Sequence, residues 1–271
     1  MIIDRSDKTQ EHLVSQAFSN QSVHFDHIYT SNAISEWMRS RARNEVMRFI
    51  QPGQHMLELN CGTGMDTIWF AQRGIRILAT DNAPGMLARL EEKTKDNHLE
   101  AMIEARKCSF NNLEELQGSS FDYIFSNFGG LNCTGTLNET LSHFQRLLKR
   151  GGYCTLVVMP KVCPWEWLML FKGYFRTAFR RFRKHTDAHI EGVHFRCYYY
   201  NPGYVQKALG EPFETISLKG MAFFMPPPFI ENFKEKYPRT FSFLQRAELS
   251  CENIFPFNRC CDHYMITLRK K

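Results

Sequence analysis

The stretch Met56-Leu-Glu-Leu-Asn-Cys-Gly-Thr-Gly64 decides the fold, because an apolar run ends in two closely spaced glycines. An apolar segment followed by a glycine turn and a helix is typical of a strand that leads into a ligand-binding loop. The glycines at 62 and 64 allow a tight turn and let backbone N–H groups approach a ligand. A second apolar run, Ile75–Asp81, ends in a carboxylate that can accept both hydroxyls of a ribose. The two segments together predict a site for a cofactor that contains a nucleoside.

Two kinds of cofactor share this arrangement, and the residues after the glycines favour one of them. Dinucleotide sites use the pattern G-x-G-x-x-G, but Met65, Asp66 and Thr67 follow Gly64, so the third glycine is absent. Asp66 also places a negative charge in the first helical turn, where the phosphates of a dinucleotide would lie. Glu58 suits a ligand with positive charge, such as a sulfonium and an ammonium group. The sequence therefore favours a cofactor without phosphates over NADH, which an oxidoreductase would use.

The same residues carry a resemblance to a known family. Glu58–Gly64 resembles motif I of the class I S-adenosylmethionine-dependent methyltransferases, and Asp81 resembles the acidic residue that ends their second strand. Phe121–Asn127 resembles their fourth strand, and Leu147–Val158 resembles the glycine-containing approach to their fifth. Asp262–Arg269 resembles their last, antiparallel strand. The resemblance implies S-adenosylmethionine as the cofactor and methyl transfer as the reaction.

Within this family, the chain is more similar to the small-molecule enzymes. The resemblance covers roughly residues 20–160, and Pro226–Pro228 with the helix after them is similar to quinone and natural-product methyltransferases rather than to protein or RNA ones. One departure is Cys61, where many members carry glycine. Because cysteine has a Cβ, the loop can approach the ligand only if φ at 61 stays negative.

The alternation of strands and helices predicts an α/β fold with a Rossmann-like sheet. We expect seven mostly parallel strands, an antiparallel last strand, helices on both faces and a helical lid insertion after strand five. The expected strands are 55–60, 75–81, 101–108, 121–127, 152–159, 213–224 and 262–269. The chain is expected to form one methyltransferase domain, 1–271, with a helical cap at 1–50, a cofactor-binding core at 51–160, a substrate lid at 161–212 and C-terminal strands and helix at 213–271.

Ligands of such sheets bind at the carboxyl ends of the strands, which gathers the candidate cofactor residues in one cleft. The resemblance implies that the glycine loop contacts the methionine moiety, that Asp81 holds the ribose, and that Phe110 lies near the adenine. Tyr29 is expected to close over the sulfonium, where its ring can make a cation–π contact. The expected cofactor-binding residues are Tyr29, Glu58, Asn60, Cys61, Gly62, Gly64, Asp81, Asn82, Met86, Ser109, Phe110, Asn127 and Phe128.

Methyl transfer from a sulfonium requires nucleophile, carbon and sulfur in line, and an oxygen or acidic carbon nucleophile also needs a base. The preferred base is His194, in the extended segment Val193–Pro202, and His24 and Tyr29 are further catalytic candidates. No metal is expected, because the histidines and carboxylates lack the spacing of metal ligands. The sequence leaves O-, C- and N-methylation open.

Residues 165–184 combine aromatic and basic side chains in a way that predicts an amphipathic helix. The helix suits either a lid whose aromatic face covers the substrate pocket or peripheral contact with a membrane surface. Nucleic acid is not an expected partner, since no recognition module accompanies the charge. The aromatic content favours a hydrophobic or aromatic small molecule as substrate. The alternatives are a peptide- or lipid-directed methyltransferase that docks through this helix and a non-catalytic cofactor-binding scaffold.

Composition supports an ordinary globular protein of 271 residues with a net charge of +6. The N-terminal residues lack the apolar core of a signal peptide, so a cytoplasmic location is expected. Nine scattered cysteines without a CxxC pair indicate reduced, buried thiols.

Overall fold

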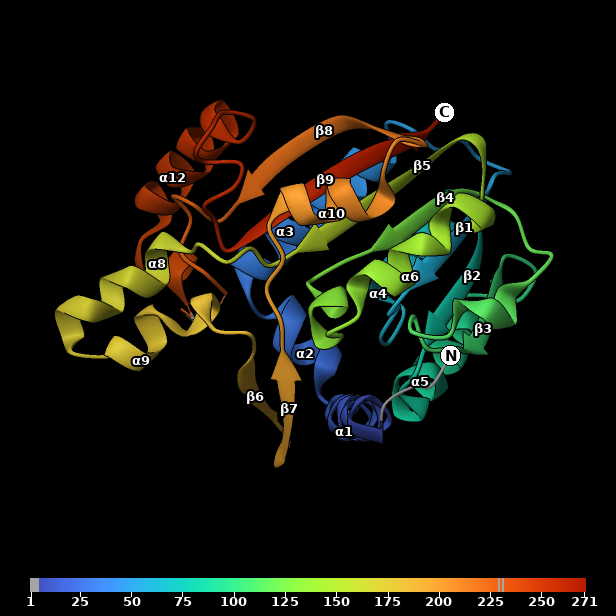
Figure 1. The fold of residues 1–271 in the computed structure, drawn as a ribbon, viewed down its shortest axis with the longest axis horizontal. Coiled ribbons are helices and arrows are strands. Elements are labelled where there is room, and N and C mark those ends of the chain that lie inside the picture. The colour runs from blue at the N-terminus through green and yellow to red at the C-terminus, as the bar shows by residue number, and fades with distance from the viewer. Residues whose placement is uncertain (1–4, 229, 231) are drawn as a thin grey trace.

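A seven-stranded sheet forms the centre of the computed structural model, which describes residues 5–228, 230 and 232–271. The strand order is β3-β2-β1-β4-β5-β9-β8 (Figure 1). β9 runs antiparallel between β5 and β8, and the other neighbours are parallel. The strands of this sheet are β1 (His55–Leu59), β2 (Arg76–Asp81), β3 (Ile103–Lys107), β4 (Phe121–Ser126), β5 (Leu148–Val158), β8 (Phe213–Met221) and β9 (His263–Lys270). The predicted seven-stranded, mostly parallel Rossmann-like sheet with an antiparallel last strand is confirmed.

Helices cover both faces of the sheet, as the near-continuous apolar strands require of a parallel sheet. One face carries α6, α7 and α10, whose Leu137, Phe144 and Val205 are fully buried against the strands. The other face carries α3, α4 and α5, together with Phe241 of α12. The bounds of the longer helices are α1 (Arg5–Gln21), α2 (Phe25–Thr30), α3 (Ala33–Val46), α4 (Met65–Ala71), α5 (Pro84–Asp96), α6 (Leu137–Ser142), α10 (Pro202–Leu209) and α12 (Pro238–Cys251); the shorter ones are α7 (Phe144–Leu147), α11 (Phe233–Lys236), η1 (Leu113–Leu116) and η2 (Gly130–Cys133).

The turn after β1 depends on its glycines. Gly62 has φ of +57° and Gly64 has φ of +79°. A Cβ at Gly64 would lie 2.3 Å from Leu90 Cδ1 of α5, so the helix packs against the loop only because this residue is glycine. Cys61 keeps a negative φ, which is the condition under which cysteine was expected to fit.

The segment 165–184 does not form the single helix that its spacing predicts. It forms the short helices α8 (Pro164–Trp167), η3 (Leu168–Lys172), α9 (Phe175–Ala178) and η4 (Arg180–Phe182). Gly173, with φ of +77°, interrupts the run. Arg180 and Arg181 both turn back to bond Glu166, so the buried ion pairs fold the segment onto itself. Side-chain spacing could not reveal these tertiary contacts.

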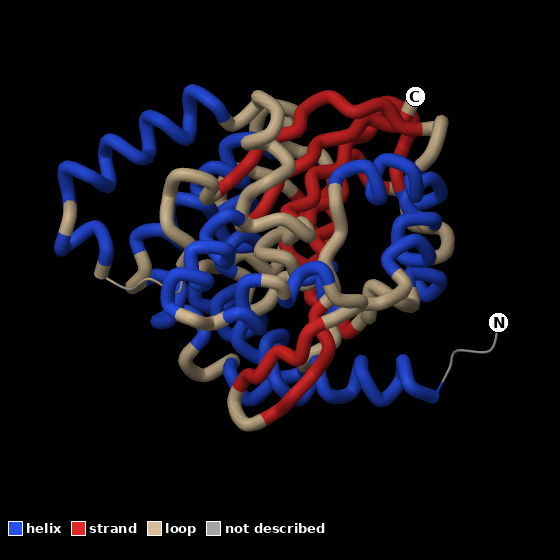
Figure 2. Tube along the Cα trace, turned by 60° about the vertical axis from the view of Figure 1, so that its left-hand side comes forward, coloured by secondary structure: helices blue, strands red, loops and turns tan. Residues whose placement is uncertain are grey.

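After this segment, β6 (Thr186–Ile190) and β7 (Val193–Cys197) form a separate hairpin. α1 packs against β7, so the N-terminal helix and the hairpin lie together at one edge of the molecule (Figure 2). α10 then packs against α6 and β8 and covers the sheet. In the described part of the chain, no helix combines the length and apolar character that crossing a bilayer requires.

Candidate active site

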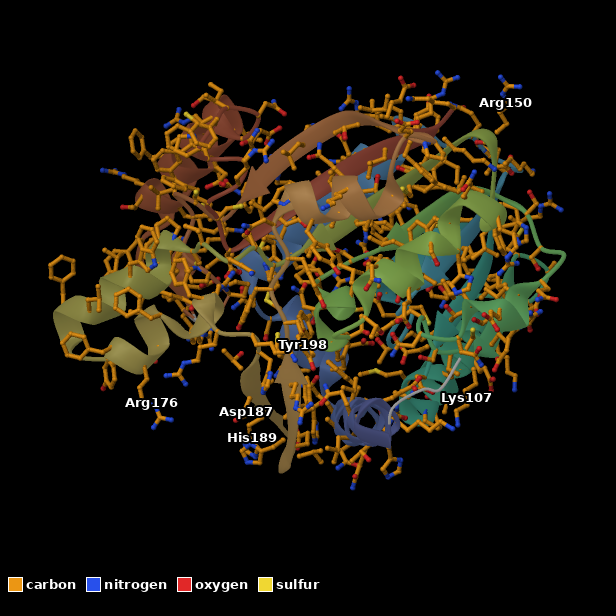
Figure 3. The ribbon with its side chains drawn as sticks, in the orientation of Figure 1. Lys107, Arg150, Arg176, Asp187, His189 and Tyr198 are labelled. Carbon is orange, nitrogen blue, oxygen red and sulfur yellow. The ribbon has the colours of Figure 1, made fainter. Side chains whose placement is uncertain are left out.

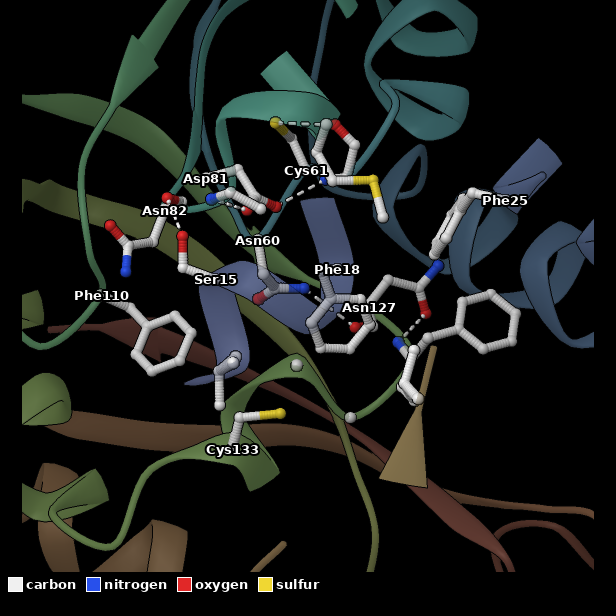
Figure 4. A pocket seen from close by; sticks show the side chains of 18 of the residues that line it. Ser15, Phe18, Phe25, Asn60, Cys61, Asp81, Asn82, Phe110, Asn127 and Cys133 are labelled. Carbon is white, nitrogen blue, oxygen red and sulfur yellow. Dashed lines mark hydrogen bonds between the residues drawn. The ribbon is translucent and has the colours of Figure 1, made fainter. Parts of the chain in front are cut away.

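A cavity of about 260 Å³ lies at the carboxyl ends of β1, β2 and β4 (Figure 4). Its floor is the glycine loop, and α1, α2 and the β6–β7 hairpin close it from above. Of the thirteen expected cofactor residues, all except Gly64 line it, and Gly64 lies at the N-terminus of α4. The strand-end rule thus brings together side chains from four separate strands.

Asp81 links the end of β2 to the glycine loop. Its Oδ2 accepts a hydrogen bond from the Gly62 N–H at 2.9 Å, and its Oδ1 accepts one from the Ala83 N–H at 2.9 Å. Burial raises the pKa of the Asp81 carboxyl, although these backbone hydrogen bonds oppose the change. The carboxylate is therefore held rigidly at the cavity wall, with its orientation set by the backbone.

Glu58 is a buried acid on β1 that faces the cavity. Its Oε2 accepts a hydrogen bond from the Thr67 hydroxyl at 2.6 Å. Burial, followed by the negative charge of Asp66, raises the pKa of Glu58 to about 8. Without a cation in the cavity, this carboxyl is mainly protonated at neutral pH.

Asp66 is the centre of a buried ionic network that the sequence did not reveal. Arg39 donates to its Oδ2 at 2.6 Å, Arg43 to its Oδ1 at 2.6 Å, and the Asn127 amide to Oδ2 at 2.9 Å. Two guanidinium groups thus neutralise the charge that was expected to repel phosphates. The missing third glycine, and not Asp66, is therefore the feature that disfavours a dinucleotide.

Arg39 of α3 lies at one end of the cavity and was not among the expected residues. Its guanidinium lies over the Phe128 ring at 4.6 Å and the Tyr29 ring at 5.9 Å. Its buried Nε makes no hydrogen bond to the described residues, and Glu36 Oε1 lies 4.0 Å from it. The Arg39 guanidinium thus supplies positive charge at this end of the cavity. The only sequence feature that could have indicated a role for Arg39 is its position among the polar residues of an amphipathic helix.

An orphaned atom lies among the residues that follow β3. Asn111, which lines the cavity beside Ser109 and Phe110, has a buried Oδ1 without a partner in the described structure. The Ser109 hydroxyl accepts the Asn111 N–H at 3.1 Å and so fixes this turn. An acceptor near Phe110 and a donor at Arg39 are groups that an adenine amine and an amino-acid carboxylate would satisfy. The cavity therefore fits S-adenosylmethionine.

α2 closes over the glycine loop through polar and aromatic contacts. Asp26 bonds the Thr63 hydroxyl and pairs with Lys93 of α5. Tyr29 contacts Phe25 at a ring distance of 4.5 Å and Phe128 at 5.5 Å. Burial raises the pKa of the Tyr29 phenol, so the group is a hydrogen-bond donor and not a phenolate at neutral pH.

The wall opposite the cofactor residues is apolar. It is built by α1, by the inward face of the β6–β7 hairpin and by Cys133 of η2. α1 and the hairpin lie side by side although they are far apart in sequence (Figure 2). The rings of Phe18 and Phe195 lie 5.9 Å apart. The side chains of this wall are Val14, Phe18, Cys133, Ala188, Ile190, Phe195 and Cys197.

The structure does not bring His24 or His194 to the cavity. His24 is exposed at the start of α2, and His194 is exposed on the outward face of β7, where its ring stacks on His189 at 4.4 Å. Side chains alternate along this strand, so the face that carries His194 points away from the cavity, and Phe195 and Cys197 point toward it.

A different histidine lies next to the cavity. His263 at the start of β9 is buried, and its Nδ1 lies 2.9 Å from Asp262 Oδ2. Arg181 donates to Asp262 Oδ1 at 2.6 Å. A Cβ added at Gly129, a lining residue, would lie 3.4 Å from His263 Nε2. The second imidazole nitrogen thus lies close to the lining residue Gly129, although His263 itself does not line the cavity.

Cys163, Glu166 and Asp262 are the described residues that come close enough to hold a metal. Arg181, however, donates to Glu166 Oε1 at 2.7 Å and to Asp262. Burial opposes ionisation of Asp262, but His263 and Arg181 more than offset it and hold the pKa of this carboxyl below its usual range. The Arg181 guanidinium therefore occupies the position that a metal ion would take in this cluster.

Comparison with known proteins agrees with this geometry. Residues 56–152 match the model of a methyltransferase domain family. Demethylmenaquinone methyltransferase of Listeria welshimeri is 28% identical over 186 residues, which are 65% of this chain and 75% of the relative. Magnesium protoporphyrin IX methyltransferase of Synechocystis, solved with S-adenosylhomocysteine, superposes with a TM-score of 0.62 at 15% identity and covers 96% of this chain and 99% of that one.

Geranyl diphosphate C-methyltransferase of Streptomyces coelicolor superposes with a TM-score of 0.55 at 11% identity, covering 87% of this chain and 80% of that one. At these identities the solved structures establish the fold, and the family match establishes the activity class. Residues 56–152 are thus a methyltransferase domain that uses S-adenosylmethionine, and the chain as a whole shares the fold of the class I S-adenosylmethionine-dependent methyltransferases.

Proposed function

We propose that the protein methylates a small apolar, planar acceptor that enters between α1 and the β6–β7 hairpin. The observation that carries the proposal is the apolar wall at Phe18, Ile190 and Phe195, which faces the cofactor residues across the cavity. A planar hydrophobic acceptor would bury its rings against this wall, and removing those rings from water would carry little free-energy cost. The curated relative that acts on a quinone precursor, as its name states, supports this acceptor class.

Within the cavity, the cofactor residues have distinct tasks. Asp81 would hold the ribose hydroxyls, and Asn82 and Met86 would flank the ribose and adenine. Ser109, Phe110 and Asn111 would hold the adenine, whose amine would satisfy the orphaned Asn111 oxygen. At the other end, Arg39 and Tyr29 would meet the carboxylate, and Glu58 the ammonium.

Asp81→Ala tests the ribose site. We expect the variant to bind S-adenosylhomocysteine more weakly by about 1–3 kcal/mol, because hydrogen bonds to a charged group are lost. Calorimetric titration measures the change. Asp122→Ala is the control, since Asp122 bonds His55 and Lys149 away from the cavity. Equal affinity of Asp81→Ala and the wild type would place the ribose elsewhere.

Glu58 makes cofactor binding depend on pH. The group is protonated at pH 7 in the free protein because its pKa is raised to about 8, and an ammonium beside it would favour the ionised form. Binding of S-adenosylhomocysteine is therefore expected to release a proton, and affinity should rise with pH up to about 8 and then level off. Calorimetry in buffers of different ionisation enthalpy measures the number of protons released on binding. Glu58→Gln should abolish the release, and an unchanged release would contradict the assignment.

An oxygen or acidic carbon acceptor needs a base, and His263 is the best-placed histidine. Asp262 holds its Nδ1, and Nε2 has no recorded hydrogen-bond partner among the described residues and lies beside Gly129 at the cavity. This arrangement favours proton removal from an acceptor seated at the end of β4. It supports O- or C-methylation over transfer to a neutral amine.

Transfer of a labelled methyl group tests the acceptor class. The protein would be incubated with methyl-labelled S-adenosylmethionine and a panel containing a reduced naphthoquinone, a hydrophobic phenol, a polar amine and a short basic peptide. We expect label in the naphthoquinone or the phenol. Label on the peptide alone would favour the peptide-directed alternative. No transfer to any acceptor, with cofactor binding intact, would favour the non-catalytic scaffold.

A further inference from the structure

The segment 164–185 carries an unusual set of exposed aromatic side chains. Phe171 is 89% exposed and Phe175 is 65% exposed. The other large apolar side chains of the segment that face solvent are Trp167, Leu168, Tyr174, Phe179 and Phe182. None of them lines the cavity, so the aromatic residues do not cover the active site as a lid would. Solvent-facing apolar groups gathered in this way mark a surface that contacts another phase or molecule.

The arginines of the same segment, together with Lys184, divide into two groups. Arg180 and Arg181 bond the buried Glu166, so they hold the segment together. Arg176, Arg183 and Lys184 are exposed, and no ion pair is recorded for them within the described residues. The structural arginines thus anchor a surface on which three further cations face solvent.

These free cations line an open hollow next to the aromatic residues. The hollow has a volume of about 520 Å³. Its charged or titratable side chains are Arg176, Arg180, Arg183, Lys184, His185 and one acid, Asp187. In Figure 3, Arg176 and Asp187 project on the same side of the molecule, and Lys107 and Arg150 lie on the opposite side of the view. The segment from α8 to η4, which carries the aromatic residues, projects from the body of the molecule at α8 and α9 (Figure 1).

We propose that this aromatic and basic surface docks the protein on an anionic lipid bilayer, with the aromatic side chains in the interface and the phospholipid headgroups in the hollow. Phenylalanine, tryptophan and tyrosine side chains enter the boundary between headgroups and acyl chains, and neighbouring lysines and arginines attract anionic lipids. Both kinds of residue are exposed in one short segment, and its single internal acid, Glu166, is buried. Charge complementarity therefore selects an anionic membrane surface.

Vesicle flotation at low salt tests the proposal, with phosphatidylcholine vesicles that contain or lack phosphatidylglycerol. We expect binding to the anionic vesicles, weak binding to the neutral ones and loss of binding at high salt. Replacing Arg176, Arg183 and Lys184 together by glutamine should weaken binding roughly hundredfold, at about fivefold for each charge. Phe171→Ser combined with Phe175→Ser should weaken it roughly tenfold, since partition follows the buried apolar area.

Matched variants on other surfaces serve as controls. Lys95, Lys107 and Arg150, exposed and outside the patch, would be replaced together by glutamine, and exposed Ile216 of β8 by serine. These variants should bind vesicles like the wild type, and all variants should keep their affinity for S-adenosylhomocysteine, which shows that they are folded.

Three binding results would overturn the proposal, and a competition experiment provides a fourth. They are no binding to either vesicle, equal loss in the control and patch variants, and retention on duplex nucleic acid without retention on vesicles. Inorganic phosphate at the concentration of the lipid headgroups should not displace the protein from vesicles, because the aromatic contacts require a bilayer. Displacement by phosphate would show that the hollow binds free phosphate and would contradict docking on a membrane.

Discussion

Arg181→Met is expected to lower the free energy of unfolding by about 3–5 kcal/mol, because it leaves two buried carboxyl groups without their shared cation. Arg181 is 3% exposed and bonds Glu166, Asp262 and the carbonyls of Pro160 and Asp262. The depressed pKa of Asp262 means that the carboxylate is charged in the folded protein at neutral pH. Methionine fills a similar volume but offers no donor, so Asp262 keeps only His263 as a partner and Glu166 only the partly exposed Arg180. Urea unfolding at pH 7 measures the loss.

Arg176→Met is the matched control, since Arg176 is exposed and unpaired among the described residues. Its free energy of unfolding should change by less than about 0.5 kcal/mol. Lowering the pH should lower the free energy of unfolding of the wild type. The contribution of ionised Asp262 is present above the pKa of an unfolded aspartate and is lost as pH falls through its lower folded pKa. Equal stability of the two arginine variants would show that the network does not hold the segment.

His263→Asn is expected to lower kcat by about 10²–10⁴-fold, the usual contribution of a general base, with the affinity for S-adenosylhomocysteine unchanged. Asparagine keeps a hydrogen bond toward Asp262 but cannot take up a proton. The rate would be measured with the acceptor that takes the label in the panel above. A fall in kcat without a change in KM or thermal stability would separate a chemical role from a structural one.

His194→Asn provides a direct comparison, because the sequence favours His194 as the base and the structure places it outside the cavity. We expect this variant to keep the wild-type rate. A large loss in His194→Asn together with full activity in His263→Asn would restore the sequence-based hypothesis. It would also mean that the β6–β7 hairpin turns its outer face inward when substrate binds.

The cofactor half of the site could be predicted from sequence because it depends on local and periodic features. A glycine loop after an apolar strand fixes the positions of Asn60 and Gly62, and the strand-end rule adds Asp81 and Asn127. Arg39 and His263 could not be found in this way. Arg39 reaches the cavity only because α3 packs beside the first turn of α4, which follows the glycine loop. His263 comes near the cavity only because β9 inserts between β5 and β8.

The substrate half of the site was harder to predict from the sequence, because it also depends on contacts between distant elements. Helical spacing in residues 165–184 predicted a continuous helix, but Glu166 attracts Arg180 and Arg181 and breaks it. The acceptor wall combines α1 with a hairpin more than a hundred and fifty residues later, as the bond from Gln10 to the Arg196 carbonyl illustrates. No local pattern encodes such a contact.

The cavity beside residues 60–64 is the site at which S-adenosylmethionine is expected to bind. Calorimetric titration of the wild-type protein with S-adenosylhomocysteine tests it most directly. Saturable binding at one site per chain, with no heat from NADH, is the predicted result. Saturable binding of NADH with no response to S-adenosylhomocysteine would contradict the account.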